Sequence, residues 1–370
     1  MMKHVLILTC STGEGHNSAA YALRTAFEDQ GVTCELADPV SFRSDRMKEL
    51  VASLYNRTIK KAPQVFGAVY RLGDVYSSSN LPSPVYWANA RYAEKLKAYI
   101  LERGFDAVVC THLYGMESMT AVLRDPDFHI PCYGVLTDYV CIPFLDETRL
   151  SGYFVPEYGA KRHLTSKGIR EDCIEITGIP VGKAFTEHPD SRSARRELGL
   201  PQDRKLILTM TGGVGCENME GFCTRIMEHM KNDAMLVVLV GKNEELKKKL
   251  ETRFGHLDSF LAVPFTRQVS LYMAACDVLI SKPGGLSSTE AAVANIPQVH
   301  FHAIPGCETY NARYFSEHGM AFLAHNEQEA VNFATTLAYR TDIAEGMREM
   351  QRAFINPHAA ADIVQKVMQP

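Results

Sequence analysis

The sequence predicts an α/β protein made of two doubly wound, Rossmann-like domains that face each other across a cleft. Three observations lead to this prediction: a length of 370 residues, a repeated alternation of strand-like and helix-like segments, and a glycine-rich turn in each half. A chain of this length exceeds one typical core and fits two domains of ordinary size. Strands that alternate with helices are typical of a parallel sheet covered by helices.

The first series of alternating segments covers residues 1–180, which we predict to form the N-terminal domain. Short apolar runs with buried-strand character occupy residues 4–9, 33–37, 107–111, 131–136 and 152–155. Helix-like segments follow the first and third of these runs and end near Gln30 and Leu123. We expect a parallel sheet with helices on both faces.

The second series covers residues 181–370, the predicted C-terminal domain. Its strand-like runs are 206–210, 235–240, 260–263, 278–281 and 298–301. The boundary is placed in the segment 178–185, where Pro180 and two glycines interrupt the pattern. The final helix, 359–368, is a candidate to return to the first domain.

Composition excludes several classes of protein. The formal net charge of −4 gives no field that attracts nucleic acid. The ten cysteines lack C-x-x-C pairs and metal-ligand spacing with histidines, so we expect reduced thiols, no disulfides and no structural zinc. The N-terminus has no secretory signal, and no apolar run approaches the roughly 20 residues of a spanning helix. We therefore expect a cytoplasmic protein that touches a membrane at most from the inner face.

The glycine turn of the first half places a histidine at the start of a helix. His16 follows Gly13 and Gly15 directly after the first strand, at the edge of the sheet where ligands of such folds bind. A neutral imidazole can remove the proton of an alcohol near neutral pH, so His16 is our candidate for the catalytic base. The alternative is a histidine that caps the helix or bonds to a backbone carbonyl.

Two acidic motifs in the first half lead to different interpretations. Asp138 follows the strand-like run 131–136 and is a candidate to orient a histidine or to bind the acceptor hydroxyl, with a turn or helix cap as the equal alternative. Asp125 and Asp127 form a D-x-D motif, but they precede that strand. This position is at the wrong edge of the sheet, which favours a solvated turn over a metal site.

The glycine turns of the second half predict a diphosphate site. Helix N-termini present free N–H groups and a positive dipole end to anions, and hydroxyls can add to them. The candidate residues for this nucleotide site are Gly15 in the first half and Gly212, Gly213, Gly284, Gly285, Ser287, Ser288 and Thr289 in the second. Such a site neutralises phosphate without a metal ion.

Further side chains of the second half are candidates for contacts with the rest of a nucleotide sugar. Glu290 could accept hydrogen bonds from ribose hydroxyls, with a first-turn acid that complements the helix dipole as the alternative. Glu308 and Asn311 lie in a polar turn and are candidates to bind the sugar, although an inert loop is equally compatible with them. Val263 and Phe265 are candidates to contact a uracil base.

Residues 51–73 combine basic and aromatic side chains without an acid. This composition suits a surface with anionic lipid headgroups, and an amphipathic helix packed on the first domain is the equal alternative. The aromatic pattern continues beyond this stretch. Our candidates for contact with the membrane or the acceptor are Arg57, Lys60, Lys61, Phe66, Tyr70, Arg71 and Trp87.

Five short motifs in their order resemble the family of monogalactosyldiacylglycerol synthases and processive diacylglycerol glucosyltransferases. They occupy residues 12–19, 136–139, 176–180, 281–291 and 304–311, so that the resemblance spans nearly the whole chain. It implies a GT-B architecture, a UDP-glucose or UDP-galactose donor, a diacylglycerol-type acceptor, and inversion at the anomeric carbon without a metal or other cofactor. It also implies that His16 is the base, that Glu290 binds ribose and that Glu308 binds the donor sugar. Cys307 departs from the family, which has glutamine there, and leaves the hexose open.

The function that this resemblance implies is a membrane-associated hexosyltransferase. Two alternatives remain open from the sequence. The same scaffold supports a UDP-sugar epimerase, because fold does not determine chemistry. The other alternative is a UDP-sugar sensor without catalytic activity. Activity with and without a lipid acceptor distinguishes the three.

Overall fold

The computed structural model of the protein describes residues 2–10, 14–42, 82–210 and 218–369. The chain divides into two compact units. Unit 1 comprises Met1–Gly182, Pro305–Cys307 and Asn356–Pro370, and unit 2 comprises Lys183–Ile304 and Glu308–Ile355. The chain thus first passes from unit 1 to unit 2 two residues after the boundary placed from the sequence, and its last segment belongs to unit 1.

The core of unit 1 is a six-stranded sheet in the order β2-β1-β3-β4-β5-β6. All neighbouring strands are parallel. The strands are β1 (His4–Leu8), β2 (Thr33–Ala37), β3 (Ala107–Cys110), β4 (Cys132–Val135), β5 (Gly152–Val155) and β6 (Ile174–Ile176). β3 and β5 are buried along their whole length, as expected for central strands of a parallel sheet that is covered on both faces.

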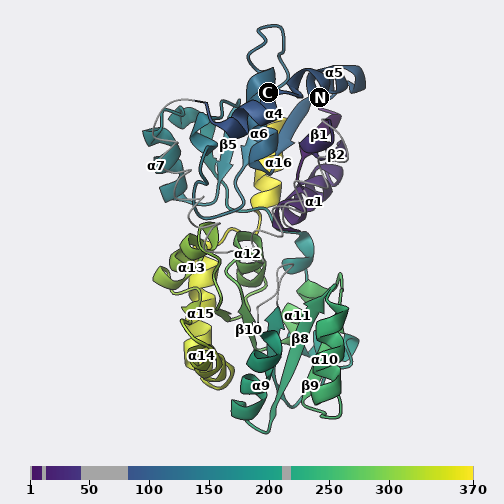
Figure 1. The fold of residues 1–370 in the computed structure, drawn as a ribbon, viewed down its shortest axis with the longest axis vertical. Coiled ribbons are helices and arrows are strands. Elements are labelled where there is room, and N and C mark those ends of the chain that lie inside the picture. Colours follow the sequence, from purple (N-terminus) through teal and green to yellow (C-terminus); the bar gives the residue numbers. More distant parts are fainter. Residues whose placement is uncertain (1, 11–13, 43–81, 211–217, 370) are drawn as a thin grey trace. The chain divides into compact units, whose positions relative to one another are not determined.

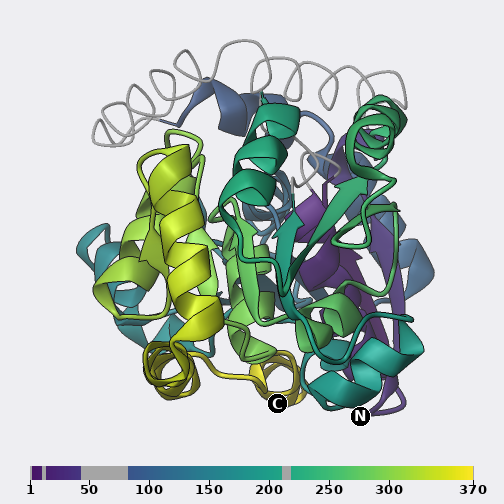
Figure 2. The same cartoon turned by 90° about the horizontal axis from the view of Figure 1, so that it is seen from below.

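Helices cover both faces of this sheet. They are α1 (Glu14–Glu28), η1 (Pro39–Phe42), α4 (Pro84–Ala90), α5 (Ala93–Arg103), α6 (Leu113–Val122), η2 (Leu145–Glu147), α7 (Tyr158–Ser166), η3 (Glu171–Cys173) and α16 (Ala359–Met368). Val5 and Ile7 point to a core shared with α1 and α16, whereas Leu6 and Leu8 point to a core shared with α5, α6 and α7. α16 packs beside α1, and both views place the two ends of the chain near one another (Figures 1 and 2).

Unit 2 contains a second six-stranded parallel sheet, in the order β12-β11-β10-β7-β8-β9. Its strands are β7 (Lys205–Met210), β8 (Ala234–Gly241), β9 (Phe260–Pro264), β10 (Val278–Ser281), β11 (Gln298–His300) and β12 (Phe322–Leu323). The two sheets confirm the predicted pair of doubly wound units.

The helices of unit 2 again lie on both faces of their sheet. They are η4 (Lys183–Phe185), α8 (Ser191–Glu197), α9 (Met219–His229), α10 (Glu244–Phe254), α11 (Val269–Ala275), α12 (Gly285–Val293), α13 (Cys307–Glu317), α14 (Glu327–Tyr339) and α15 (Thr341–Phe354). One apolar cluster joins the sheet to α9, α10 and α14, and another joins it to α8, α11 and α12.

Nine of the ten cysteines lie in the described part of the chain. The cysteines within it form no disulfide. It contains no group of three or more His, Cys, Asp or Glu side chains arranged to hold a metal ion. None of its helices combines the length and the apolarity needed to span a membrane.

Candidate active site

Each sheet has one topological switch point, where two neighbouring strands are followed by connections that run in opposite directions along the sheet. Each of the two glycine-rich segments of the sequence follows a strand at such a point. In unit 1 the neighbours are β1 and β3, and in unit 2 they are β7 and β10. The turn after β1 leads into α1, and the turn after β10 leads into α12. Ligands of open α/β sheets bind beside the carboxyl ends of strands at such switch points.

In unit 1, hydrogen bonds from two neighbouring strands fix the ring of His16. Its Nδ1 lies 3.0 Å from the carbonyl oxygen of Thr111, which follows β3. The hydroxyl oxygen of Thr137, which follows β4, lies 2.9 Å from the same nitrogen. Thr111 also donates its own hydroxyl to the backbone carbonyl of His16, at 3.1 Å. The start of α1 is thereby tied to the ends of β3 and β4.

These contacts determine the tautomer of His16. A carbonyl oxygen only accepts hydrogen bonds, so Nδ1 must carry the proton that faces Thr111. Nε2 is then the basic nitrogen, and no hydrogen bond to it is found within the described residues. Burial lowers the pKa of His16 to about 4, and the bond to the Thr111 carbonyl offsets part of this effect. At neutral pH the ring is therefore uncharged and can accept a proton on Nε2.

A second histidine lies against the first. The rings of His16 and His112 meet edge to face, with centroids 4.5 Å apart. His112 precedes α6, and its Nδ1 accepts the Tyr114 N–H at 3.2 Å, so it caps that helix. Burial and the neighbouring His16 hold the pKa of His112 well below its usual range. Sequence reasoning missed His112, although its position directly after a switch-point strand was an available signal.

Asp138 lines the same pocket as His16, next to Thr137. Asp138 was a candidate to orient a histidine. The hydroxyl of its neighbour Thr137 bonds to Nδ1 of His16. His16 is therefore oriented at Nδ1 by a carbonyl and an uncharged hydroxyl.

In unit 2, the N-terminus of α12 has no side-chain cap. Gly284 is the N-cap residue, and no side chain bonds to the first N–H groups. α8, α9, α10 and α14 of the same unit are instead capped by an Asp or Asn side chain. The first N–H groups of a helix have no partner within the helix itself, so those of α12 are available to an anion.

A small pocket lies at the carboxyl ends of β7, β10 and β11, against α9. Its lining includes Ser281, Lys282 and His302. The Ser281 side chain is buried, and its hydroxyl has no hydrogen-bond partner within the described residues. His302 has a left-handed backbone with φ of 58°, which is uncommon outside glycine and recurs at functional sites. None of these three residues was predicted from the sequence as a site residue.

Glu308 and Lys282 form an ion pair at the same edge of unit 2. The Lys282 ammonium lies 3.5 Å from Oε1 of Glu308, and both side chains are 16% exposed. The other carboxylate oxygen of Glu308 accepts the Ile304 N–H at 2.8 Å. A negative group predicted to bind sugar and a positive group at the α12 turn are thus held close together.

Residues 16–181 match the family model described as monogalactosyldiacylglycerol (MGDG) synthase. The processive diacylglycerol beta-glucosyltransferase of Bacillus pumilus is 23% identical over 371 residues, covering 99% of this chain and 95% of that protein. The enzyme of the same description from Staphylococcus carnosus is 29% identical over 236 residues, covering 63% and 60%.

The chain is similar to the diacylglycerol glycosyltransferases. This confirms the resemblance given by the sequence motifs. MurG of Acinetobacter baumannii resembles the structure with a TM-score of 0.64 at 16% identity, covering 99% of both chains. The UDP-GlcNAc 2-epimerase of Neisseria meningitidis, bound to UDP-GlcNAc, gives 0.65 at 14% identity and covers both chains completely. At such identities the likeness concerns the fold, and it confirms the GT-B architecture.

Three of the predicted ligand side chains are fully buried. Ser288, Thr289 and Asn311 have no exposed surface. The Thr289 hydroxyl donates to the Gly285 carbonyl at 2.6 Å, and the Ser288 hydroxyl bonds to His300. The hydroxyls of Ser288 and Thr289 therefore bond to groups of unit 2 itself. This differs from the direct ligand contacts expected from the sequence, because the period of the helix turns these positions toward the sheet.

The other predicted nucleotide residues keep some access to solvent. Gly284, Ser287 and Glu290 are partly exposed, whereas Gly285 is buried in the first turn. Burial raises the pKa of Glu290 to about 8. Such a carboxyl is largely protonated at neutral pH and becomes ionised in mildly alkaline solution.

The predicted uracil contacts lie at the end of β9. Val263 is buried in the sheet, and Phe265 is 57% exposed. The ammonium of Lys242 lies 5.3 Å from the centre of the Phe265 ring. An exposed aromatic ring of this kind is free to stack on a base.

Among the acceptor-side candidates, Trp87 lies on α4 and is 55% exposed. Gly15 lies in the first turn of α1. The remaining predicted residues lie outside the described residues: Gly212 and Gly213 of the nucleotide set, and Arg57, Lys60, Lys61, Phe66, Tyr70 and Arg71 of the membrane set.

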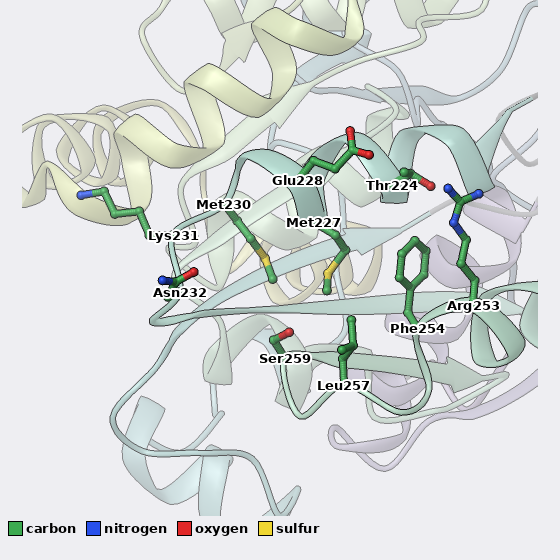
Figure 3. A pocket seen from close by; sticks show the side chains of 10 residues that line it. All are labelled: Thr224, Met227, Glu228, Met230, Lys231, Asn232, Arg253, Phe254, Leu257 and Ser259. Atoms are coloured by element: carbon green, nitrogen blue, oxygen red, sulfur yellow. The ribbon is translucent and has the colours of Figure 1, made fainter.

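Another pocket of unit 2 lies away from all these residues (Figure 3). It is formed by the ends of α9 and α10 and by the segments that enter β8 and β9. The side chains of Met227, Met230, Phe254 and Leu257 line it together with Arg253 and Lys231. Because it borders the amino ends of these strands, it is at the opposite edge of the sheet from Lys282.

Proposed function

We propose that the protein is an inverting, metal-independent glycosyltransferase that moves a hexose from a UDP-sugar to a diacylglycerol-type lipid at a membrane surface. The observation that carries this proposal is the neutral His16, whose basic Nε2 lies at the switch point of unit 1. The relatives described as diacylglycerol glucosyltransferases support the nature of the reaction.

In the proposed reaction, the proton of the acceptor hydroxyl moves to Nε2 of His16 as the oxygen bonds to the anomeric carbon. The bond between that carbon and the β-phosphate oxygen breaks, and UDP leaves with the electron pair. An attack in line with the departing group inverts the anomeric centre. The proposal requires the base of unit 1 and the donor bound to unit 2 to meet in the reacting complex. Positioning and electrostatics then supply most of the rate.

The leaving diphosphate is stabilised by groups of unit 2 in this proposal. The uncapped N–H groups of α12 and the Lys282 ammonium are both at the end of β10. Together they provide positive charge and donors where a metal ion acts in other transferases. The unpartnered Ser281 hydroxyl can donate one further bond.

The remaining donor contacts follow from the chemistry of the predicted residues. Glu290, in its ionised form, accepts hydrogen bonds from the ribose. Glu308 binds hydroxyls of the hexose, and Phe265 packs on the uracil beside Val263. Cys307 offers no amide to the sugar. The proposal therefore includes both UDP-glucose and UDP-galactose as candidate donors.

The lipid acceptor is proposed to approach unit 1 from the inner face of the membrane. Trp87 is an exposed aromatic side chain on α4, which is separated by ten residues (74–83) from the basic and aromatic segment 51–73. Indole rings are favoured at the boundary between headgroups and acyl chains.

The decisive experiment incubates the purified protein with UDP-glucose or UDP-galactose and diacylglycerol in vesicles that contain an anionic phospholipid. We expect a hexosyl-diacylglycerol by mass spectrometry, and a β-linkage by NMR because the α-linked donor is inverted. Activity that survives in excess chelator supports the absence of a metal. A glycolipid with retained configuration contradicts the proposed mechanism.

A UDP-sugar epimerase is the second candidate, because a fold shared with a UDP-GlcNAc 2-epimerase does not determine the chemistry. The same assay without lipid tests it, because an epimerase converts the UDP-sugar with no acceptor present. A protein that binds UDP-sugars but transforms them under neither condition would instead be a sensor.

A further inference from the structure

Beneath α12, three fully buried polar residues form a closed hydrogen-bond network. Ser288 lies on α12, and Gln298 and His300 lie two residues apart on β11. The Gln298 amide nitrogen donates to the Ser288 carbonyl at 3.1 Å. Nε2 of His300 lies 3.2 Å from the amide oxygen of Gln298 and 3.1 Å from the Ser288 hydroxyl.

The donors and acceptors of this network can be assigned from its one backbone group. The Ser288 carbonyl only accepts, so it must face the amide nitrogen of Gln298, and the amide oxygen then faces His300. That oxygen also only accepts, so Nε2 of His300 carries the proton. Burial lowers the pKa of His300 to about 3, which keeps the ring neutral. Its Nδ1 is a buried acceptor without a partner in the described part of the chain.

The network is connected directly to the first turn of α12. Ser288 donates its backbone N–H to the carbonyl of Gly284, the N-cap residue, at 2.9 Å. One turn of helix therefore separates the buried network from the uncapped N–H groups. Because Gln298 and His300 of β11 hold Ser288 in position, they also hold Gly284 in position after the end of β10.

The sequence of α12 explains why such support is needed. The helix has nine residues, with serine at 287 and 288 and threonine at 289. Short helices are marginal by themselves, and Ser and Thr hydroxyls compete for backbone hydrogen bonds. The N-terminus also lacks a side-chain cap that would stabilise it. Packing against β11 must therefore hold the first turn in place.

We propose that Gln298 and His300 are positioning residues, which hold the first turn of α12 where its N–H groups receive the donor diphosphate. This inference rests on the proposed donor site of unit 2. It assigns a role to Ser288 that differs from the direct phosphate contact expected from the sequence. In this proposal the Ser288 hydroxyl bonds to His300, and the backbone N–H groups of the first turn of α12 bind the diphosphate.

The test compares the affinities of UDP and uridine, measured by isothermal titration calorimetry at fixed salt. Uridine has the base and ribose but no phosphate. Replacing His300 by leucine (His300→Leu) leaves the Gln298 oxygen and the Ser288 hydroxyl without this donor. We expect the dissociation constant of UDP to rise roughly tenfold and that of uridine to change less than about twofold. His300→Gln, which can place an N–H near the position of Nε2, should restore much of the UDP affinity.

A matched control separates positioning from loss of stability. Leu250 is fully buried on α10, which packs on β8 and β9 away from α12. Leu250→Ala should lower the melting temperature of the protein without changing the ratio of UDP to uridine affinity. An equal loss of both affinities in His300→Leu, or a ratio like that of Leu250→Ala, contradicts the positioning role. If the wild-type protein binds UDP but glycosylates no lipid, the proposed function is contradicted, whereas the positioning role of Gln298 and His300 is not.

Discussion

At the scale of single residues, the neighbours of His16 explain which form of the ring is available for catalysis. A carboxylate at Nδ1 would raise the pKa of the imidazole, because it stabilises the charged form. His16 instead contacts the Thr111 carbonyl and the Thr137 hydroxyl, which are both uncharged. Burial therefore dominates, and the ring stays neutral across the physiological range of pH. The site has a weak base that is always in its basic form.

The role of His16 is tested by removing the ring. His16→Ala should lower kcat by a factor on the order of 10² to 10⁴, because the acceptor loses its base. The dissociation constant of UDP should stay the same, since the proposed donor contacts lie in unit 2. His129→Ala, an exposed histidine of unit 1, is the control and should be fully active. Normal turnover in His16→Ala would remove the residue from the mechanism.

The low pKa of His16 also predicts the pH dependence of the reaction. For an exposed histidine, kcat/KM would fall below pH of about 6.5. Burial lowers the pKa of His16 to about 4, so the acid limb should begin well below 6. Because the folded state binds this proton less tightly than the unfolded chain does, stability also declines as pH falls from about 6.5 toward 4. Rates are therefore recorded together with circular dichroism. A midpoint near 6.5 with an intact fold contradicts this prediction.

Glu290 predicts a pH effect of the opposite sign. Burial raises its pKa to about 8, so the folded protein holds this proton more tightly than the unfolded chain does. Stability is therefore lost as pH rises from about 4.5 to 8. Glu290→Gln removes the titration, and its melting temperature relative to wild type should be higher at pH 8.5 than at pH 5. Glu244→Gln, exposed at the start of α10, should show no such trend.

At the scale of elements, the sequence predicts ten of the twelve described strands and misses two short edge strands. β2, β5 and β10 have the predicted bounds, and the other predicted strands differ by one residue at one or both ends. β6 and β12 were not predicted. β6 has only one buried residue in the pattern Ile-Glu-Ile, and β12 has two partly exposed residues. These two edge strands of three and two residues are too short and too exposed to contain the apolar run that marks a buried strand.

The candidate site was predictable only in part, for a related reason. The glycines next to His16 are local to it and are visible in the sequence. The two partners of Nδ1 are 95 and 121 residues away, and they reach His16 because β1 lies next to β3 and β3 next to β4. Strand order cannot be read from an apolar pattern. Likewise, the inward direction of Ser288 and Thr289 depends on which face of α12 meets the sheet.

The turn between β10 and α12 gives a prediction about charge. Lys282→Met removes the only charged group of that turn while keeping a side chain of similar length. The dissociation constant of UDP should rise roughly tenfold, as expected for one charge-assisted contact, and that of uridine should not change. Lys205→Met is the matched control, since Lys205 forms an ion pair at the same distance of 3.5 Å at the start of β7. Equal UDP affinity in both variants would exclude Lys282 from the diphosphate site.

At the scale of the whole molecule, unit 1 is built from both ends of the chain. Ile363, Val364 and Val367 of α16 are buried in the same cluster as Val5 and Ile7 of β1. The segment before α16 is fixed as well, because the Asn356 amide donates to the Thr177 carbonyl at 2.9 Å and to the carboxylate of Asp362 at 2.7 Å. The core that supports β1 is therefore complete only when the last residues are present.

This dependence gives a prediction about stability that concerns one unit alone. Ile363→Ala should destabilise unit 1 by about 2–5 kcal/mol, because it leaves a cavity in a fully packed core. Hydrogen exchange should show faster exchange in β1, α1 and β3, while β8 of unit 2 keeps its protection. Val331→Ala, buried between α14 and the sheet of unit 2, should give the reverse pattern. Faster exchange of both units in Ile363→Ala would mean that α16 does not stabilise unit 1 independently. The turn that presents His16 connects β1 to α1, so the same variant should also lose activity more steeply on heating than Val331→Ala does.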